Sequence, residues 1–211
     1  MELDVHITLD GQLIVLHDSD LQRMCGVEGL VEDMTLDQLS SCRLNGTDEK
    51  IPLFSEVLSL VDGRVPLIVE IKAPRKDLLV CSKTCAMLSA YHGPYCVESF
   101  NPFAVRWFRK NAPHLVRGQL TEFTARDKRP KGMFWTAHHL TNWLARPDFI
   151  AFNCTSKKNF SLRLIRDVFK PMMVSWTIRS QDVFDREKKV NDLLIFESFS
   201  PVHNSDLNQQ N

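Results

Sequence analysis

Residues 2–17 read ELDVHITLDGQLIVLH, and this stretch is the strongest local indication of how the chain folds. Two strand-like runs, the alternating residues 2–8 and the mostly apolar residues 13–17, are separated only by the four residues LDGQ at 9–12. An Asp-Gly pair between two alternating runs is a strong signal for a β-hairpin. The sequence therefore predicts two antiparallel strands, and the second of them should lie outside any parallel sheet.

Beyond this hairpin, short apolar runs alternate with longer amphipathic runs. Further strands are predicted at Leu67–Ile71, Tyr95–Phe100, Val116–Leu120, Phe149–Asn153, Met173–Ile178 and Leu193–Glu197. Helices are predicted at Thr35–Ser41, Phe54–Val61, Lys76–Tyr91, Pro102–Asn111, Leu140–Ala145, Leu162–Phe169 and Gln181–Lys189. Alternation of strands and helices is typical of a parallel α/β architecture.

The number of strands leaves two kinds of α/β fold open. Without the return strand of the hairpin, seven strands are predicted for the parallel sheet. A doubly wound sheet could use seven, but the chain has no glycine-rich loop of the kind that supports its nucleotide-binding versions. A (β/α)₈ barrel needs eight strands and typically about 250 residues, so the chain is one β/α unit short of it at the start. We expect a single domain over residues 1–202, followed by a polar tail at 203–211.

The composition excludes several classes of protein. Twenty-six basic residues balance 26 acidic ones, whereas nucleic-acid binders usually carry a basic excess. No run approaches the roughly 20 apolar residues of a membrane helix, and no signal segment precedes the first strand. Six cysteines are too sparse for a disulfide scaffold in a chain of 211 residues. We therefore expect reduced thiols and a cytoplasmic protein, provided that no signal or membrane segment precedes Met1.

Charged residues interrupt the apolar runs where a parallel sheet should be buried. Alternation places Glu2, Asp4 and His6 on one face of the first strand, and Glu70 shares a face with Lys72. A strand with one solvated face would explain this pattern in an antiparallel sheet, but strands of a parallel core are buried on both faces. Buried carboxylates need a cation or hydrogen bonds. The pattern thus indicates a site for a hard divalent metal and an anion at the carboxyl ends of the strands.

Several short motifs occur in the order and spacing of a known family. They are Glu2-Leu3-Asp4-Val5, the turn Thr8-x-Asp10-Gly11, the pair His17-Asp18, Leu21-x-Arg23, Glu70-Ile71-Lys72, Glu98-Ser99-Phe100 and Trp176-Thr177. Through them the chain resembles the glycerophosphodiester phosphodiesterases over nearly its whole length. The resemblance implies an α/β fold, the TIM (β/α)₈ barrel with an inserted β-hairpin. It also implies hydrolysis of glycerophosphodiesters to glycerol 3-phosphate and an alcohol.

The resemblance further implies a metal site and a phosphate contact. Glu2, Asp4 and Glu70 would bind a divalent metal, Mg²⁺ or Ca²⁺, because both are hard cations that prefer oxygen ligands. The metal would offset the charge that develops on the phosphodiester. Lys72 would hold another phosphate oxygen as a point charge.

Two more residues receive roles from the resemblance, and one does not. His17 matches one of the family's two acid/base histidines. Trp176 would form a wall of the pocket beside the glycerol or the head group, although an aromatic residue can equally belong to the core. His6 matches no catalytic position of the family, and we interpret it as a structural histidine or one that supports the site.

The departure from the family lies at the front of the chain. The family's first strand, with His-Arg-Gly, and its Glu-Asn-Thr helix start would precede Met1. That strand holds the other acid/base histidine, whose loss should reduce the rate roughly 10²–10⁴-fold. A barrel without the strand would have unpaired edges and should be unstable or self-associate.

Three readings of the function stay open. The first is a phosphodiesterase given without its first β/α unit. The second is a truncated, catalytically impaired relative that binds only a metal or a phosphorylated ligand. The third is a phospholipase D-like lipid phosphodiesterase, because such enzymes share this motif set.

Overall fold

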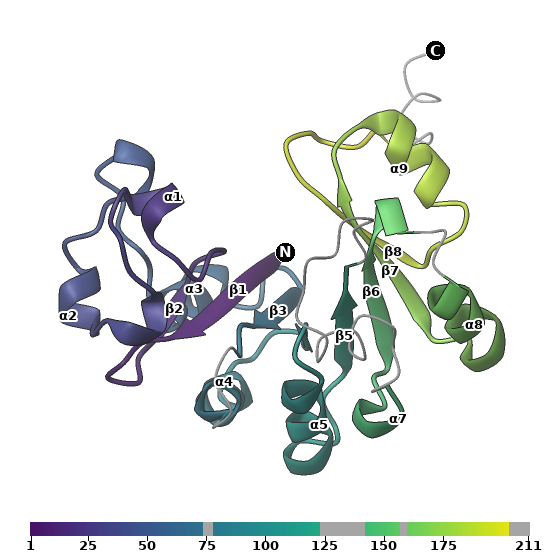
Figure 1. The fold of residues 1–211 in the computed structure, drawn as a ribbon, viewed down its shortest axis with the longest axis horizontal. Coiled ribbons are helices and arrows are strands. Elements are labelled where there is room, and N and C mark those ends of the chain that lie inside the picture. Colours follow the sequence, from purple (N-terminus) through teal and green to yellow (C-terminus); the bar gives the residue numbers. More distant parts are fainter. Residues whose placement is uncertain (74–77, 123–141, 157–159, 203–211) are drawn as a thin grey trace. The chain divides into compact units, whose positions relative to one another are not determined.

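A computed structural model describes residues 1–73, 78–122, 142–156 and 160–202 of the chain. The chain divides into two units, shown in Figure 1. The first contains residues 1–119 and 144–147, and the second contains residues 120–143 and 148–211. The predicted polar tail, 203–211, lies outside the described residues.

The predicted hairpin is confirmed at the start of the first unit. Strand β1 (Glu2–Ile7) pairs in antiparallel fashion with β2 (Leu13–Val15). In the turn, the Thr8 amide donates a hydrogen bond to the Gln12 carbonyl at 2.9 Å. Gly11 adopts a φ of +80°, a conformation that favours glycine. The turn that contains Asp10 and Gly11 therefore sets the register of the hairpin.

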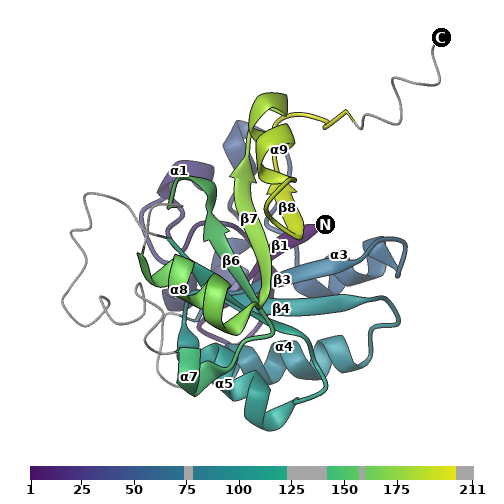
Figure 2. The same cartoon turned by 90° about the vertical axis from the view of Figure 1, so that its right-hand side faces the viewer.

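Three more strands extend the sheet of the first unit. They are β3 (Leu67–Ile71), β4 (Tyr95–Ser99) and the first three residues of β5 (Arg117–Thr121), whose last two belong to the second unit. Figure 2 shows β3 and β4 side by side, and the strands β1, β3, β4 and β5 pair in this order, all parallel. In this register Asp4 lies beside Glu70, and Glu70 lies beside Glu98. Acidic residues from three neighbouring strands are thus placed at one level.

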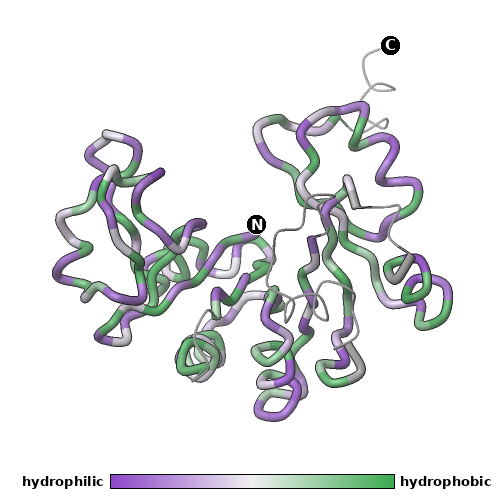
Figure 3. The backbone as a smooth tube through the Cα atoms, viewed as in Figure 1, coloured by the Kyte–Doolittle hydropathy of each residue, from purple (hydrophilic) through white to green (hydrophobic). Residues whose placement is uncertain are grey.

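The helices of the first unit are α1 (Gln22–Cys25), α2 (Leu36–Leu39), α3 (Phe54–Val61), α4 (Leu79–Ser89) and α5 (Pro102–Asn111), with 3₁₀ turns at Val31–Asp33 and Leu44–Gly46. Four of them, α2 to α5, lie in predicted ranges, whereas the short helix α1 was not predicted. The side chain of Asn101 caps α5 by accepting a hydrogen bond from the Phe103 amide at 2.9 Å. Figure 3 shows that α5 is hydrophobic toward the strands and hydrophilic on its outer side. This amphipathic pattern explains why the helix packs against the sheet.

The core of the first unit lies between its strands and its helices. Val5, Val69 and Val97, from β1, β3 and β4, pack in one cluster with Phe54 of α3 and Phe108 of α5. All five are at most 1% exposed. Since successive residues of a strand point to opposite faces, this core leaves the other face of the sheet to the charged residues.

The second unit has its own strands and core. Strands β6 (Phe149–Asn153), β7 (Met172–Ile178) and β8 (Leu193–Phe196) pair parallel in that order. Its helical segments are α8 (Phe160–Phe169), α9 (Gln181–Glu187) and a 3₁₀ turn at Cys154–Ser156, while α7 (Asn142–Ala145) spans the boundary between the units. Ile150, Phe152, Leu162, Ile165 and Met173 form the core.

The part of the chain that the structure describes contains no helix that is both long enough and apolar enough to cross a membrane.

Candidate functional site

Three carboxylates predicted as metal ligands come together in the first unit. Glu2 and Asp4 lie on one face of β1, and Glu70 lies on β3 in register with Asp4. Each offers an oxygen, and these oxygens all lie within 4.8 Å of one another. Asp4 and Glu70 are buried and Glu2 is partly exposed, so the cluster is open on one side.

Lys72 follows β3 directly and lies between two of these carboxylates. Its ammonium nitrogen is 2.8 Å from an Asp4 oxygen and 2.7 Å from a Glu70 oxygen. Burial lowers the pKa of Lys72, but Glu70 and Asp4 together raise it above its ordinary value. Lys72 therefore stays charged and neutralises one negative charge of the cluster.

One lysine does not balance the three carboxylates. Burial raises the pKa of Glu2 to about 7, and the charge of Asp4 adds to this effect. Burial also raises the pKa of Glu70, again with a contribution from Asp4. Without another cation, the cluster relieves its charge by holding protons near neutral pH. A hard divalent cation fits this set, because oxygen ligands suit it and its charge would replace those protons.

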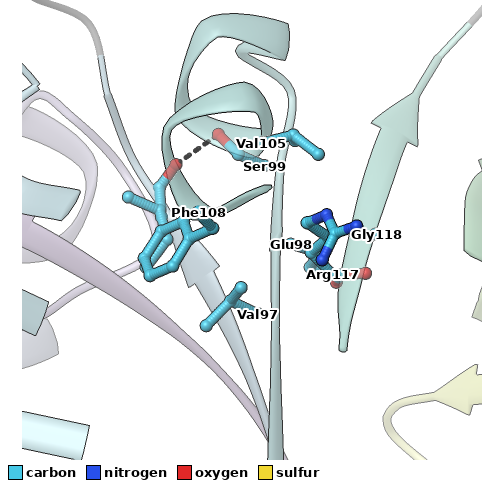
Figure 4. A pocket seen from close by; sticks show the side chains of 8 residues that line it. Val97, Glu98, Ser99, Val105, Phe108, Arg117 and Gly118 are labelled. Atoms are coloured by element: carbon cyan, nitrogen blue, oxygen red, sulfur yellow. Dashed lines mark hydrogen bonds between the residues drawn. The ribbon is translucent and has the colours of Figure 1, made fainter. Parts of the chain in front are cut away.

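A fourth carboxylate, Glu98, was not predicted as a site residue. It is 2% exposed, and its pKa is raised well above the ordinary value by burial first and then by Glu70 and Glu2. Figure 4 shows it lining a small cavity with Arg117 of β5. Its signal in the sequence is a glutamate inside an apolar strand, the same signal that singles out Glu70.

His17 lies two residues beyond the end of β2 and is held by its neighbours. Its ring is 72% exposed, and its Nδ1 is 2.6 Å from an oxygen of Asp18. The other oxygen of Asp18 is 2.5 Å from Nε of Arg23. The amide of Leu16 donates a hydrogen bond to the Asp4 carbonyl at 3.2 Å, so the chain before His17 is tied to β1, the strand that carries Glu2 and Asp4.

His6 lies on the acidic face of β1 but is deeply buried. It is 1% exposed, and burial together with the charge of Lys72 lowers its pKa to about 4. Its ring is therefore neutral at pH 7, and it donates a hydrogen bond to the backbone of His17. This geometry supports the interpretation of His6 as a histidine that holds the site together.

Trp176 lies in the second unit, on β7. It is half-buried and in register with Asn153 of β6. Its role in substrate binding stays a prediction.

A family profile matches this chain, and several curated proteins are similar to it. The profile, described as the glycerophosphoryl diester phosphodiesterase family, matches residues 1–194. A glycerophosphodiester phosphodiesterase of Caldanaerobacter subterraneus subsp. tengcongensis is 31% identical over 131 residues, which cover 57% of this chain and 54% of that protein. A lysophospholipase D of Rattus norvegicus is 34% identical over 91 residues, 37% of this chain and 29% of that one. The chain thus spans about half the length, or less, of these relatives.

A solved structure shares the fold. The phosphodiesterase of Oleispira antarctica, in complex with the product sn-glycerol-3-phosphate, matches with a TM-score of 0.73 at 18% identity. The match covers 92% of this chain and 79% of that one. This likeness shows the fold that the sequence predicts, an α/β architecture of the TIM-barrel type.

Proposed function

This chain belongs to the glycerophosphoryl diester phosphodiesterase family, and from this premise we propose that it hydrolyses glycerophosphodiesters to glycerol 3-phosphate and an alcohol. We further propose that Glu2, Asp4 and Glu70 bind Mg²⁺ or Ca²⁺ for this reaction. The observation that carries the proposal is the convergence of their oxygens within 4.8 Å, next to a charged lysine. The product complex of the Oleispira antarctica enzyme supports a small-molecule substrate of this kind.

The acidic cluster with Lys72 would bind the substrate, and His17 would transfer the proton. A divalent cation supplies charge that stabilises the phosphoryl oxygens as the reaction proceeds. Lys72 contacts a second phosphate oxygen with its ammonium group and releases part of its contact with Asp4 and Glu70 to do so. His17 exchanges a proton with the nucleophile or with the departing alkoxide at its exposed ring.

The direct test compares metal-dependent activity with metal binding. Purified protein is incubated with glycerophosphocholine and Mg²⁺ or Ca²⁺, and released glycerol 3-phosphate is measured. We expect Glu70→Gln to reduce the release by about 10²-fold or more, because it removes a charged ligand from a three-carboxylate set. Glu28→Gln is the matched control, since Glu28 is exposed and lies outside the cluster.

Each outcome assigns the protein to one reading. Loss of activity and of calorimetric metal binding in Glu70→Gln alone supports the proposal. Full activity in Glu70→Gln would show that the metal assignment is wrong. Metal binding by the unmodified protein, with no hydrolysis of any glycerophosphodiester, would favour the catalytically impaired relative.

A second candidate function rests on the likeness to the lysophospholipase D of Rattus norvegicus. Under this reading the protein removes the head group from a lysolipid. Choline release from lysophosphatidylcholine and from glycerophosphocholine, measured side by side, separates the two functions. Release from the lysolipid alone would replace the first proposal with the second.

Two further expectations stay predictions. One is the cytoplasmic location, and the other is self-association if the family's first strand is absent.

A further inference from the structure

The loop after β2 contains His17 and two charged residues that lie close to its ring, Asp18 and Arg23. Resting on the function proposed above, we propose that Asp18 and Arg23 are positioning residues for His17. Asp18 keeps the proton of the neutral ring on Nδ1, so that Nε2 is the atom that exchanges protons with the substrate, and Arg23 holds the other oxygen of Asp18.

The distances show that Asp18 uses each of its two oxygens for a different partner. One oxygen lies 2.6 Å from Nδ1 of His17, and the other lies 2.5 Å from Nε of Arg23. The hydrogen bond from Arg23 lowers the pKa of Asp18 to about 2. Asp18 is therefore an ionised carboxylate, which only accepts hydrogen bonds.

An acceptor at Nδ1 decides the tautomer of the ring. A neutral imidazole carries one proton on either nitrogen, and the hydrogen bond made by one nitrogen selects which. Because Asp18 cannot donate, Nδ1 of His17 must carry the proton and Nε2 is left with its lone pair. The ring is 72% exposed, so the contact with Asp18 is its main side-chain restraint.

Arg23 reaches Asp18 because the segment from residue 18 to residue 31 folds back on itself. Leu21 is fully buried, and its amide donates a hydrogen bond to the Gly29 carbonyl at 3.1 Å. Helix α1 then ends at Cys25 and is capped by Gly26, which has a φ of +68° and whose amide donates a hydrogen bond to the Gln22 carbonyl. This short helix presents Arg23 to the Asp18 carboxylate, which gives the helix a part in positioning His17.

Asp18→Asn tests the proposal because an amide has one acceptor end and one donor end. The Arg23 Nε–H needs an acceptor, so the amide oxygen should turn toward Arg23 and the amide NH₂ toward His17. A donor at Nδ1 forces the ring proton onto Nε2. In the double variant Asp18→Asn/Arg23→Ala the amide is free to turn its oxygen back to Nδ1. Removing Arg23 should therefore repair the damage caused by Asp18→Asn.

The primary measurement is ¹H–¹⁵N NMR of the His17 ring in the labelled chain, at an alkaline pH where the ring is neutral. We expect the proton on Nδ1 in the unmodified protein and in Arg23→Ala, on Nε2 in Asp18→Asn, and on Nδ1 again in the double variant. Asp20→Asn is the matched control, since Asp20 is a neighbouring aspartate whose side chain accepts a hydrogen bond from the Gln22 amide at 3.1 Å. It should leave the tautomer unchanged.

Activity provides the second measurement. Asp18→Asn should reduce kcat for release of glycerol 3-phosphate by about 10²-fold or more, with little change in KM. The double variant should recover at least about tenfold of that loss. A residue that only supports the local fold would give the opposite result, because a second substitution would add to the damage.

The two measurements separate this proposal from the function on which it rests. If the tautomers follow the expected pattern but the unmodified protein releases no glycerol 3-phosphate, the positioning role stands and the proposed function fails. If the unmodified protein is active and the ring keeps its proton on Nδ1 in Asp18→Asn, the positioning role is overturned.

Discussion

The first unit builds its two chemically active groups in different ways. The acidic cluster comes from strands and consists of Glu2, Asp4, Glu70 and Lys72. The histidine group comes from the loop after β2 and consists of His17, Asp18 and Arg23. The acidic cluster is largely buried, whereas the side chains of His17 and Arg23 are 72% and 61% exposed.

The two groups should differ in how strongly their function is coupled to the stability of the fold. The register of β1 and β3 fixes the acidic cluster, so its charges are confined whether or not a cation is present. Confined like charges oppose folding until they are neutralised. The histidine group relies on side-chain hydrogen bonds at the surface, which contribute little to stability. Changes in the cluster should therefore alter both folding and activity, and changes in the histidine group should alter activity alone.

Lys72→Met should have the largest effect, because it removes the only described cation between Asp4 and Glu70. Breaking a buried ion pair leaves an unpaired charge, so we expect a loss of about 3 kcal/mol in the free energy of unfolding without metal. Activity should fall about 10²–10³-fold, because a group that stabilises the phosphate is lost.

Urea unfolding with and without Mg²⁺ or Ca²⁺ checks this expectation, and added metal should restore part of the stability. Lys83→Met, on the exposed side of α4, is the control. Equal stability of the two variants would mean that the cluster is not confined in the way described.

The dependence of stability on pH gives the next largest effect. Glu2, Glu70 and Glu98 have raised pKa values in the folded protein, so above pH 4.5 they hold protons that the unfolded chain has lost. The stability of the metal-free protein should therefore fall as pH rises, by about 1.4 kcal/mol per pH unit for each such carboxylate. His6, with its lowered pKa, opposes this trend only below pH 6.5.

Thermal unfolding between pH 6.5 and pH 8 isolates the carboxylates from His6. Glu98→Gln should make this slope shallower, because it removes one of the protons concerned, and saturating Mg²⁺ should flatten it further. Glu28→Gln, at the surface, should leave it unchanged. A stability of the metal-free protein that rises with pH over this range would contradict the raised pKa values.

The strand-borne cluster could be predicted from the sequence more fully than the loop-borne histidine group. The acidic cluster was predictable, because alternation along a strand and the parallel pairing of β1 with β3 bring Asp4 and Glu70 together. The helix at Phe54–Val61 was predicted at both ends, since an apolar repeat follows Pro52 there. Glu98 was predictable by the same rule and was overlooked as a site residue.

The histidine group was only half predictable. The His17-Asp18 pair and Arg23 stand out as motif residues, but no periodicity relates residues 18 and 23 in a loop. Their contact depends on the buried Leu21 and on the turn at Gly26, which only the folded backbone reveals. A sequence pattern can identify such residues, but the hydrogen bonds that give them a common role need coordinates.

Arg23→Ala should have the smallest effect on stability, and it tests directly whether the histidine group contributes to folding. Arg23 is exposed, and an ion pair at the surface stabilises the folded state very little. We therefore expect no measurable change in the midpoint of thermal unfolding, even though Arg23 decides how Asp18→Asn behaves. A clear loss of thermal stability would mean that Arg23 holds the inserted segment together. In that case its effect on His17 would follow from folding, and the two groups would not differ in the way their structures indicate.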